Sequence, residues 1–272
     1  MTLRILIKKI FRRLLKFITK KRPDFLEQNK KNKIKECYIC GEQFESFYKF
    51  HTPLSNKLAA SHFQLIGSDA ENFGCYYCNC NDRERHLFMY FDKLSLWDKF
   101  RDSRILHFAP EAPLSNKIEQ LRPSEYIKGD LFPREDWEKI DITKIDFEDN
   151  YFDILIANHI LEHVPEYFLA LKEISRVLKK DGFAIIQTPY SELFYNHFED
   201  SNINTDELRV SFYGQEDHVR IVSKRQFFDE LSQYFTLNII KNESLFTDDE
   251  CYKFGVNKKE DLVMVINNKG SK

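Results

Sequence analysis

The chain has 272 residues, of which 42% are apolar and 15% aromatic, so it can bury a sizeable core and is not a disordered polypeptide. Its net charge of −2 hides an asymmetry, because residues 1–22 carry nine Lys or Arg and no acid, which leaves −11 on the other 250 residues. The acidic body argues against a general polyanion binder, and no apolar run reaches the roughly 18 residues that span a bilayer.

Residues 1–23 have the pattern of a basic amphipathic helix that ends at Pro23. Such a helix can lie in an anionic membrane surface, and the alternatives are packing on the body or a partner, or mitochondrial targeting. Lysines and arginines interrupt every stretch that would serve as the apolar core of a secretory signal. We therefore expect a cytoplasmic protein, held at the inner membrane surface if this helix binds lipid.

Residues 24–36 are polar and rich in Lys and Asn, which predicts a linker, and residues 37–81 form a cysteine-rich module. Two C-x-x-C pairs in this module predict a zinc site with four cysteine ligands, structural because no position is left for water. The four ligands are Cys37, Cys40, Cys75 and Cys78.

Three alternatives to this ligand set remain open. Cys80 is able to replace Cys78, and His51 or His62 is able to supply a nitrogen ligand. The third alternative is that the cysteines are free thiols that only pack, because Cys is among the most buried residue types.

A connecting helix is expected over residues 82–103, followed by a domain over residues 104–270 in which short apolar strands alternate with helices. This alternation predicts an α/β fold with a doubly wound, mostly parallel, seven-stranded sheet covered on both faces. A polar insert, residues 191–222, follows the fifth strand, where such sheets place substrate loops. The strands are expected at 105–108, 126–129, 140–143, 152–158, 183–189, 235–240 and 261–267, and the helices at 113–121, 165–179 and 224–234.

The first two strands have the layout of a nucleotide site. The strand that starts at Arg104 turns at Ala109 and Pro110 toward a helix, and the second strand ends at Asp130 about twenty residues later. That spacing places a carboxylate on a ribose hydroxyl in α/β nucleotide sites.

Four segments of the chain resemble class I methyltransferases that use S-adenosylmethionine, of the type 11 group, with an N-terminal cysteine-rich zinc-binding element. The segments are LHFAPE, DITKIDFEDNYFDILIANHILEHVP, RVLKKDGFAIIQTP and EDHVRIVS. The resemblance runs from about residue 37 to about residue 267 and leaves the basic helix outside. It implies a Rossmann-like fold and S-adenosylmethionine as cofactor.

In that family a glycine-rich turn after an acidic residue approaches the cofactor. Here His107 takes the position of the acid, Ala109 that of the first glycine and Glu111 that of the second. The resemblance implies that His107 or Glu111 bonds the amino or carboxylate end of the cofactor, and the alternative is a decayed pocket. It also implies ribose binding by Asp130, contacts to adenine by Asp141 and Ile142, and closure of the methionine side by Asn158.

Methyl transfer depends mostly on positioning, but a hydroxyl acceptor benefits from a base. The candidate bases are His159, His163 and His218, because imidazole titrates near neutrality. We expect a small-molecule or glycan acceptor, with RNA or a noncatalytic interaction protein as alternatives. The H-x-x-E-H pattern over residues 159–163 is a remote indication of a metalloprotease.

Overall fold

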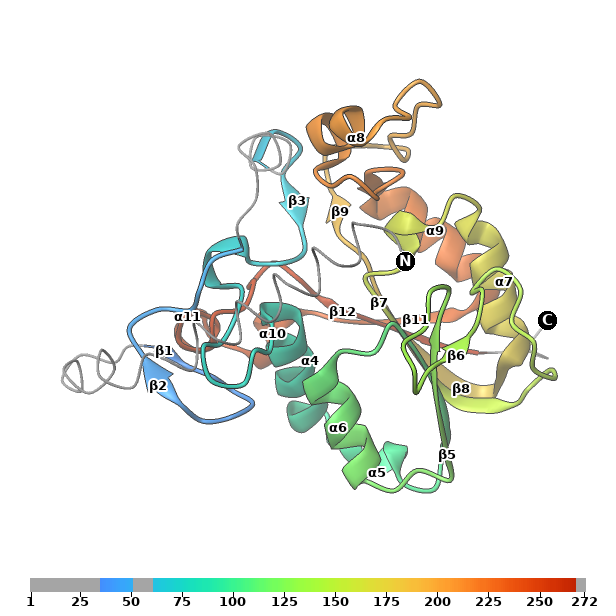
Figure 1. Cartoon of the computed structure of the whole chain (residues 1–272), viewed down its shortest axis with the longest axis horizontal. Helices are drawn as coiled ribbons and strands as arrows, with labels where there is room; N and C mark the ends of the chain where they lie inside the picture. Colours follow the sequence, from blue (N-terminus) through green and yellow to red (C-terminus); the bar gives the residue numbers. More distant parts are fainter. Residues whose placement is uncertain (1–34, 51–60, 268–272) are drawn as a thin grey trace.

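The computed structural model describes residues 35–50 and 61–267. Its centre is a seven-stranded sheet with the order β11-β12-β8-β7-β4-β5-β6 (Figure 1). The strands from β6 to β8 in this order are parallel, whereas β12 runs antiparallel to both of its neighbours. The strands are β4 Arg104–Phe108, β5 Glu125–Asp130, β6 Glu138–Lys139, β7 Phe152–Asn158, β8 Leu178–Gln187, β11 Thr236–Ile240 and β12 Leu262–Ile266.

The predicted doubly wound, mostly parallel sheet is confirmed. The predicted strand at 140–143 is wrong, because β6 lies earlier, at Glu138–Lys139. The residues after β6 instead form a turn, in which the Lys144 amide donates to the Asp141 carbonyl at 2.9 Å. The basic helix over residues 1–23, most of the linker, and His51 lie outside the described residues.

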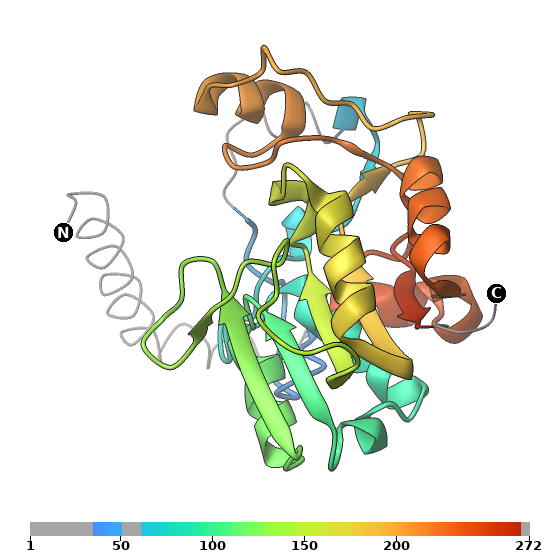
Figure 2. The same cartoon turned by 90° about the vertical axis from the view of Figure 1, so that its right-hand side faces the viewer.

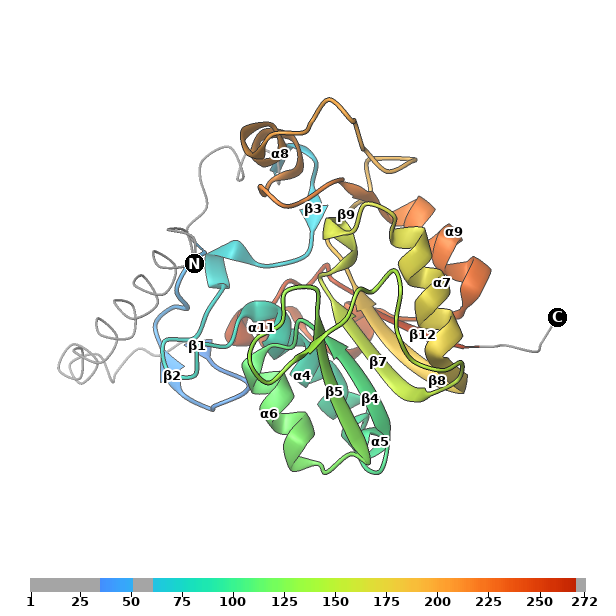
Figure 3. The same ribbon diagram turned by 45° about the vertical axis from the view of Figure 1, so that its right-hand side comes forward.

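Two groups of helices cover the two faces of the sheet (Figure 3). α7 (Tyr167–Val177) and α9 (Lys224–Tyr234) share a buried cluster with Leu106 of β4, and α4 (Asp82–Lys93) and α6 (Ala112–Gln120) share another with Ile105. Neighbouring residues of a strand point to opposite faces, so both faces of β4 are apolar. This explains why the central strands β4 and β7 have nearly continuous apolar sequences rather than alternating ones.

The predicted connecting helix over residues 82–103 is two helices. α4 starts with a capping box between Asn81 and Glu84, and α5 covers Trp97–Phe100. Ser95 lies between them with φ 53°, a left-handed conformation that an α-helix does not accommodate. The break lets α5 pack Phe100 into the core beside α4.

The insert and the N-terminal module meet above the carboxyl edge of the main sheet (Figure 2). β3 (Leu65–Ile66) of the module pairs with β9 (Tyr190–Ser191), which pairs with β10 (Val222–Ser223) at the end of the insert. The remaining elements are β1 Lys35–Glu36, β2 Gln43–Phe44, η1 Ala70–Asn72, η2 Leu161–His163, α8 Asp206–Tyr213, α10 Asn242–Leu245 and α11 Asp248–Phe254. Among residues 35–50 and 61–267, no helix is both long and apolar enough to cross a membrane.

Candidate cofactor and acceptor site

The carboxyl ends of three neighbouring strands form the centre of the site. Phe108 of β4 pairs with Gly129 of β5 on one side and with Ala157 of β7 on the other. Asp130 and Asn158, the next residues of those strands, therefore lie level with the turn at Ala109. The chain leaves β4 toward β5 and later returns on the other side as β7, and ligands of open α/β sheets bind in the crevice at such a reversal.

The turn after β4 keeps a glycine-like conformation without a glycine. Ala109 has φ 44°, and its amide donates to the Gly129 carbonyl at 2.8 Å. A residue with a Cβ pays about 1–2 kcal/mol for the left-handed conformation, and Ala has the smallest side chain that does so. Ala109 thus has a left-handed conformation that a glycine would adopt without strain.

Glu111 bridges this turn to β7. Its Oε1 accepts a hydrogen bond from Asn158 Nδ2 at 2.6 Å, and its Oε2 lies 3.4 Å from His107 Nε2. Burial raises the pKa of Glu111, but the hydrogen bond and charge of His107 and the charge of Arg83 outweigh it, so the pKa lies below its ordinary value. Glu111 is therefore an ionised acceptor at neutral pH.

His107 supports Glu111 from inside the sheet. The imidazole is fully buried in β4, and its Nδ1 lies 2.8 Å from the Tyr126 hydroxyl. With one nitrogen directed at Tyr126 and the other at Glu111, His107 orients the carboxylate. Of the two side chains expected to meet the cofactor at this turn, Glu111 is the one placed at the crevice.

The predicted ribose and adenine residues lie along the same edge. Asp130 Oδ1 accepts from the Phe132 amide at 2.7 Å, and a carboxylate has capacity for further donors. Asp141 is exposed and accepts from both the amide and the hydroxyl of Thr143, at 2.8 and 2.7 Å. Ile142 is buried in the core cluster on the α7 side of the sheet.

Sequence reasoning missed Arg83, which reaches the crevice from the first turn of α4. It lines a small cavity at the ends of β7 and β8 that has no room for a water molecule, together with His86, Leu87, Tyr90, Asn158, Gln187 and Glu260. Arg83 Nε and Asn158 Oδ1 are buried without a hydrogen-bond partner among the described residues, whereas Glu111 Oε2 faces His107 Nε2 at 3.4 Å. Unpaired buried polar atoms of both signs are what a zwitterionic ligand would satisfy. No sequence signal separated Arg83 from the neighbouring Arg85.

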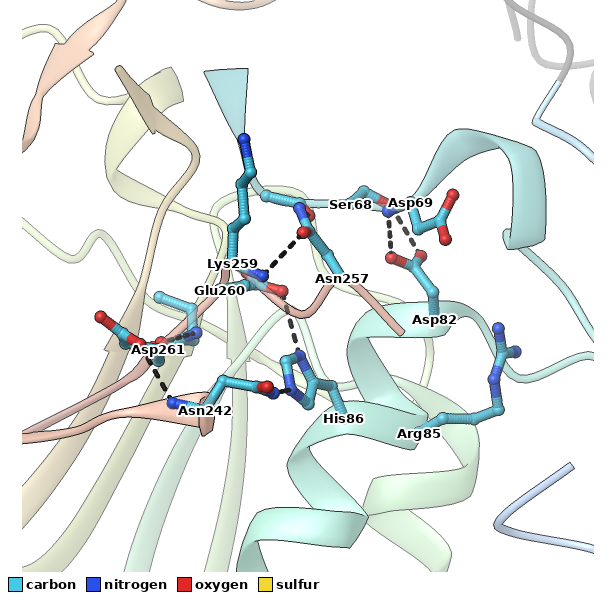
Figure 4. Close-up of polar contacts among 12 residues, drawn as sticks. Ser68, Asp69, Asp82, Arg85, His86, Asn242, Asn257, Lys259, Glu260 and Asp261 are labelled. Atoms are coloured by element: carbon cyan, nitrogen blue, oxygen red, sulfur yellow. Dashed lines mark hydrogen bonds and ion pairs between the residues drawn. The ribbon is translucent and has the colours of Figure 1, made fainter. Parts of the chain in front are cut away.

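A chain of buried polar side chains runs behind the cavity. His86 lies between Glu260 and Asn242, with Nδ1 3.4 Å from Glu260 Oε2 and Nε2 2.7 Å from Asn242 Nδ2 (Figure 4). The other oxygen of Glu260 lies 3.5 Å from His159 Nε2, and His159 Nδ1 lies 3.4 Å from Glu162 Oε1. Burial and the charge of Arg83 lower the pKa of His159, but Glu162 and Glu260 outweigh them and raise it. His159 is thus buried between two carboxylates that favour its protonated form.

His163 and His218, the other two candidate bases, lie together on the far side of Glu162. Their rings are 4.8 Å apart between centroids, in an edge-on arrangement. His163 Nε2 lies 3.9 Å from Glu162 Oε1, and the His163 side chain is 32% exposed, whereas His218 is buried. The structure brings these two histidines together from segments more than fifty residues apart.

The N-terminal module brings the four predicted cysteine ligands together. The sulfur atoms of Cys37, Cys40, Cys75 and Cys78 all lie within 4.8 Å of one another. Cys37 and Cys78 are 3.6 Å apart and Cys40 and Cys75 are 3.8 Å apart, which fits the about 3.8 Å expected for a tetrahedron with Zn–S bonds of about 2.3 Å. These four cysteines fit a zinc ion.

The two alternative ligands in the described residues lie differently. Cys80 is outside this group of four, although its sulfur lies 3.4 Å from that of Cys37, and it accepts from Arg85 Nη1 at 3.7 Å. His62 is exposed and belongs to no metal-binding group among the described residues.

Comparison with known proteins identifies part of the main domain. Residues 118–186 match the family model described as a methyltransferase domain. A demethylmenaquinone methyltransferase of Staphylococcus aureus (strain JH9) is 44% identical over 45 residues, which are 16% of this chain and 19% of that protein. The chain thus matches about a fifth of the length of this curated relative.

Solved structures with a similar fold include two S-adenosylmethionine dependent methyltransferases. The one from Mesorhizobium loti has a TM-score of 0.48 at 12% identity, covering 65% of this chain and 96% of that chain. The one from Archaeoglobus fulgidus has a TM-score of 0.46 at 16% identity, covering 69% and 95%. The family match itself starts after Ala109 and Glu111 and includes Asp130, Asp141 and Asn158.

Proposed function

We propose that this chain, which belongs to the class I S-adenosylmethionine-dependent methyltransferases, transfers a methyl group from S-adenosylmethionine to an oxygen atom of a small molecule or glycan precursor. The observation that carries the proposal is the arrangement at the carboxyl edge. Asp130, Ala109 and Asn158 lie level on neighbouring strands, and Glu111 is bonded to Asn158 across the switch point.

The polar atoms of the crevice suit the methionine end of the cofactor. Asn158 keeps a buried acceptor oxygen without a partner among the described residues, and the ionised Glu111 lies beside it, so the pair suits an ammonium group. Arg83 supplies a positive charge beside them, which suits the carboxylate. Asp130 accepts from the ribose hydroxyls, and Asp141 and Ile142 flank the adenine in this proposal.

The acceptor side lies at Glu162, His163 and His218, where the insert contacts the turn after β7. On attack, the acceptor lone pair forms a bond to the methyl carbon while the carbon–sulfur bond breaks, its electron pair stays on sulfur, and the acceptor proton is lost. His163 is the exposed member of the group and so the imidazole best placed to take that proton. His159 is held between two carboxylates, so its role in the proposal is to orient Glu162.

The acceptor class rests on charge and on the surface of the loops. The −11 charge outside residues 1–22 disfavours RNA, which proteins hold mainly through phosphate contacts. Exposed aromatic side chains, Phe132 and Tyr195, lie in the loops after β5 and β9 and suit a sugar ring or an apolar group. The cysteine group would hold a structural zinc ion in the module that covers this edge.

Calorimetry with S-adenosylmethionine tests the cofactor site. We expect the full chain to bind, Asp130→Ala to lose at least about tenfold in affinity because it removes a charged acceptor, and Asp136→Ala to bind as wild type. Asp136 is a matched control, because it is an exposed acid in the next loop that pairs with Lys128. Absence of binding by the wild-type chain would refute the enzyme and favour a noncatalytic interaction protein.

A further inference from the structure

Hydrogen bonds join the segment after β7 to the end of the insert and hold three potential metal ligands in place. These are Glu162, His163 and His218. Arg220 is buried, and its guanidinium donates to the carbonyls of Leu161, Val164 and Pro165 at 3.1, 2.6 and 2.6 Å. The Val219 amide donates to the Glu162 carbonyl at 3.0 Å. Residues 217–220 therefore hold a fixed position against residues 161–165.

His163 and His218, which lie in these two joined segments, each donate one ring nitrogen's hydrogen to a backbone carbonyl. His163 Nδ1 lies 3.2 Å from the Asp217 carbonyl oxygen, and His218 Nδ1 lies 3.2 Å from that of Tyr213. A carbonyl oxygen only accepts, so each Nδ1 carries the proton and each Nε2 of the neutral ring presents a lone pair. Backbone carbonyls hold metal-binding histidines in this same tautomer.

The third side chain of the group is the carboxylate of Glu162, which its neighbours also hold in place. Glu162 Oε2 accepts from the Thr188 hydroxyl at 2.9 Å, and Oε1 faces His159 Nδ1 at 3.4 Å on one side and His163 Nε2 at 3.9 Å on the other. Glu162, His163 and His218 each offer one ligand atom, and these atoms lie within 4.8 Å of one another. Both nitrogens of His159 face carboxylates, so His159 is not part of the group.

We propose that Glu162, His163 and His218 bind a divalent transition-metal ion. Two imidazole nitrogens and one carboxylate oxygen are a donor set that proteins use for Zn²⁺ with an open coordination position. The partial exposure of His163 leaves the group open on one side. The site differs from the cysteine group in donors and in openness.

The consequence for methyl transfer rests on the proposed function. An ion at this position would hold an acceptor hydroxyl and lower its pKa, so that the proton leaves to water and the imidazoles serve as ligands instead of bases. A hydroxyl of a sugar suits such a site. With the ion bound, the metal and not His163 would promote loss of the acceptor proton.

Zinc stoichiometry tests the site. Full-length wild type, Glu162→Gln, His163→Gln, His218→Gln and His62→Gln are dialysed against the same free Zn²⁺, and the bound zinc is measured by mass spectrometry. We expect wild type and His62→Gln to hold one zinc per chain more than the three cluster variants. His62 is an exposed histidine outside the cluster and controls for adventitious binding.

Equal zinc in wild type and the cluster variants would overturn the metal site, and so would an equal loss in His62→Gln. Glu162→Gln is isosteric and keeps an acceptor for Thr188, and His163 is half-exposed, so these two variants carry the test if His218→Gln does not fold. Calorimetry with S-adenosylmethionine on the same samples separates the two proposals. Zinc at the cluster without cofactor binding would refute the methyltransferase and leave the metal site standing.

Discussion

Replacing Ala109 tests whether the turn after β4 has the conformation of a glycine-rich motif. In most places Ala→Gly destabilises a protein, because Gly has more conformational freedom to lose on folding, by about 0.5–1 kcal/mol. At φ 44° the substitution also relieves about 1–2 kcal/mol of left-handed strain. We therefore expect Ala109→Gly to leave the protein as stable as wild type or to stabilise it by up to about 1 kcal/mol.

Two matched variants complete this test. Ala170→Gly removes a fully buried methyl group in the middle of α7 and should cost about 2 kcal/mol, from lost helix propensity and lost burial. Ala109→Val puts a β-branched residue at positive φ and should cost about 2 kcal/mol. Urea unfolding monitored by circular dichroism measures all three. If Ala109→Gly destabilises as much as Ala170→Gly, the left-handed turn at Ala109 is refuted.

The remaining predictions concern the cofactor, the zinc and the pH dependence. Arg83→Gln should lower the affinity for S-adenosylmethionine about 10- to 100-fold in calorimetry, because it removes a charged donor. The surface variant Arg101→Gln is the control, and an equal loss of affinity in both variants would contradict a contact between Arg83 and the cofactor. Cys37→Ala should lose the zinc of the cysteine group, measured by mass spectrometry, and full zinc retention would exclude Cys37 as a ligand. Cys251→Ala changes a buried cysteine outside that group and should keep the zinc. Burial, then the charge of Arg220, lowers the pKa of His197 to about 4. Between its unfolded pKa of about 6.5 and pH 4 only the unfolded chain takes up this proton, so stability should fall by up to about 3 kcal/mol as the pH drops. His197→Gln should remove that part of the pH dependence in urea titrations, and an unchanged slope would show that the His197 proton does not cause it.

Part of the fold and the site followed from local patterns. Apolar strands alternating with helices predicted the parallel sheet, because both faces of each strand must be covered. Two C-x-x-C pairs predicted the cysteine group, because a short turn aims both sulfurs at one point. Asp130 was expected at the carboxyl edge because it ends the second strand, and Asn158 was expected there from the family resemblance; each is the last residue of its strand. The sheet, the cysteine group and the strand-end residues were all predictable because each depends on spacing along the chain or on the end of one element.

The contacts that connect distant segments were decided by the tertiary structure alone. His107 supports Glu111 only because Tyr126 of the neighbouring strand takes its other nitrogen. Arg83 reaches the crevice because α4 packs on the sheet beside β7 and β8.

His218 meets His163 because Arg220 ties the insert to the turn after β7, a contact between segments more than fifty residues apart. By itself the sequence determined which strands and cysteine pairs form and which strands end in polar residues. Only packing decided which polar atoms face each other, because contacts that close such long loops produce no repeating pattern in the sequence.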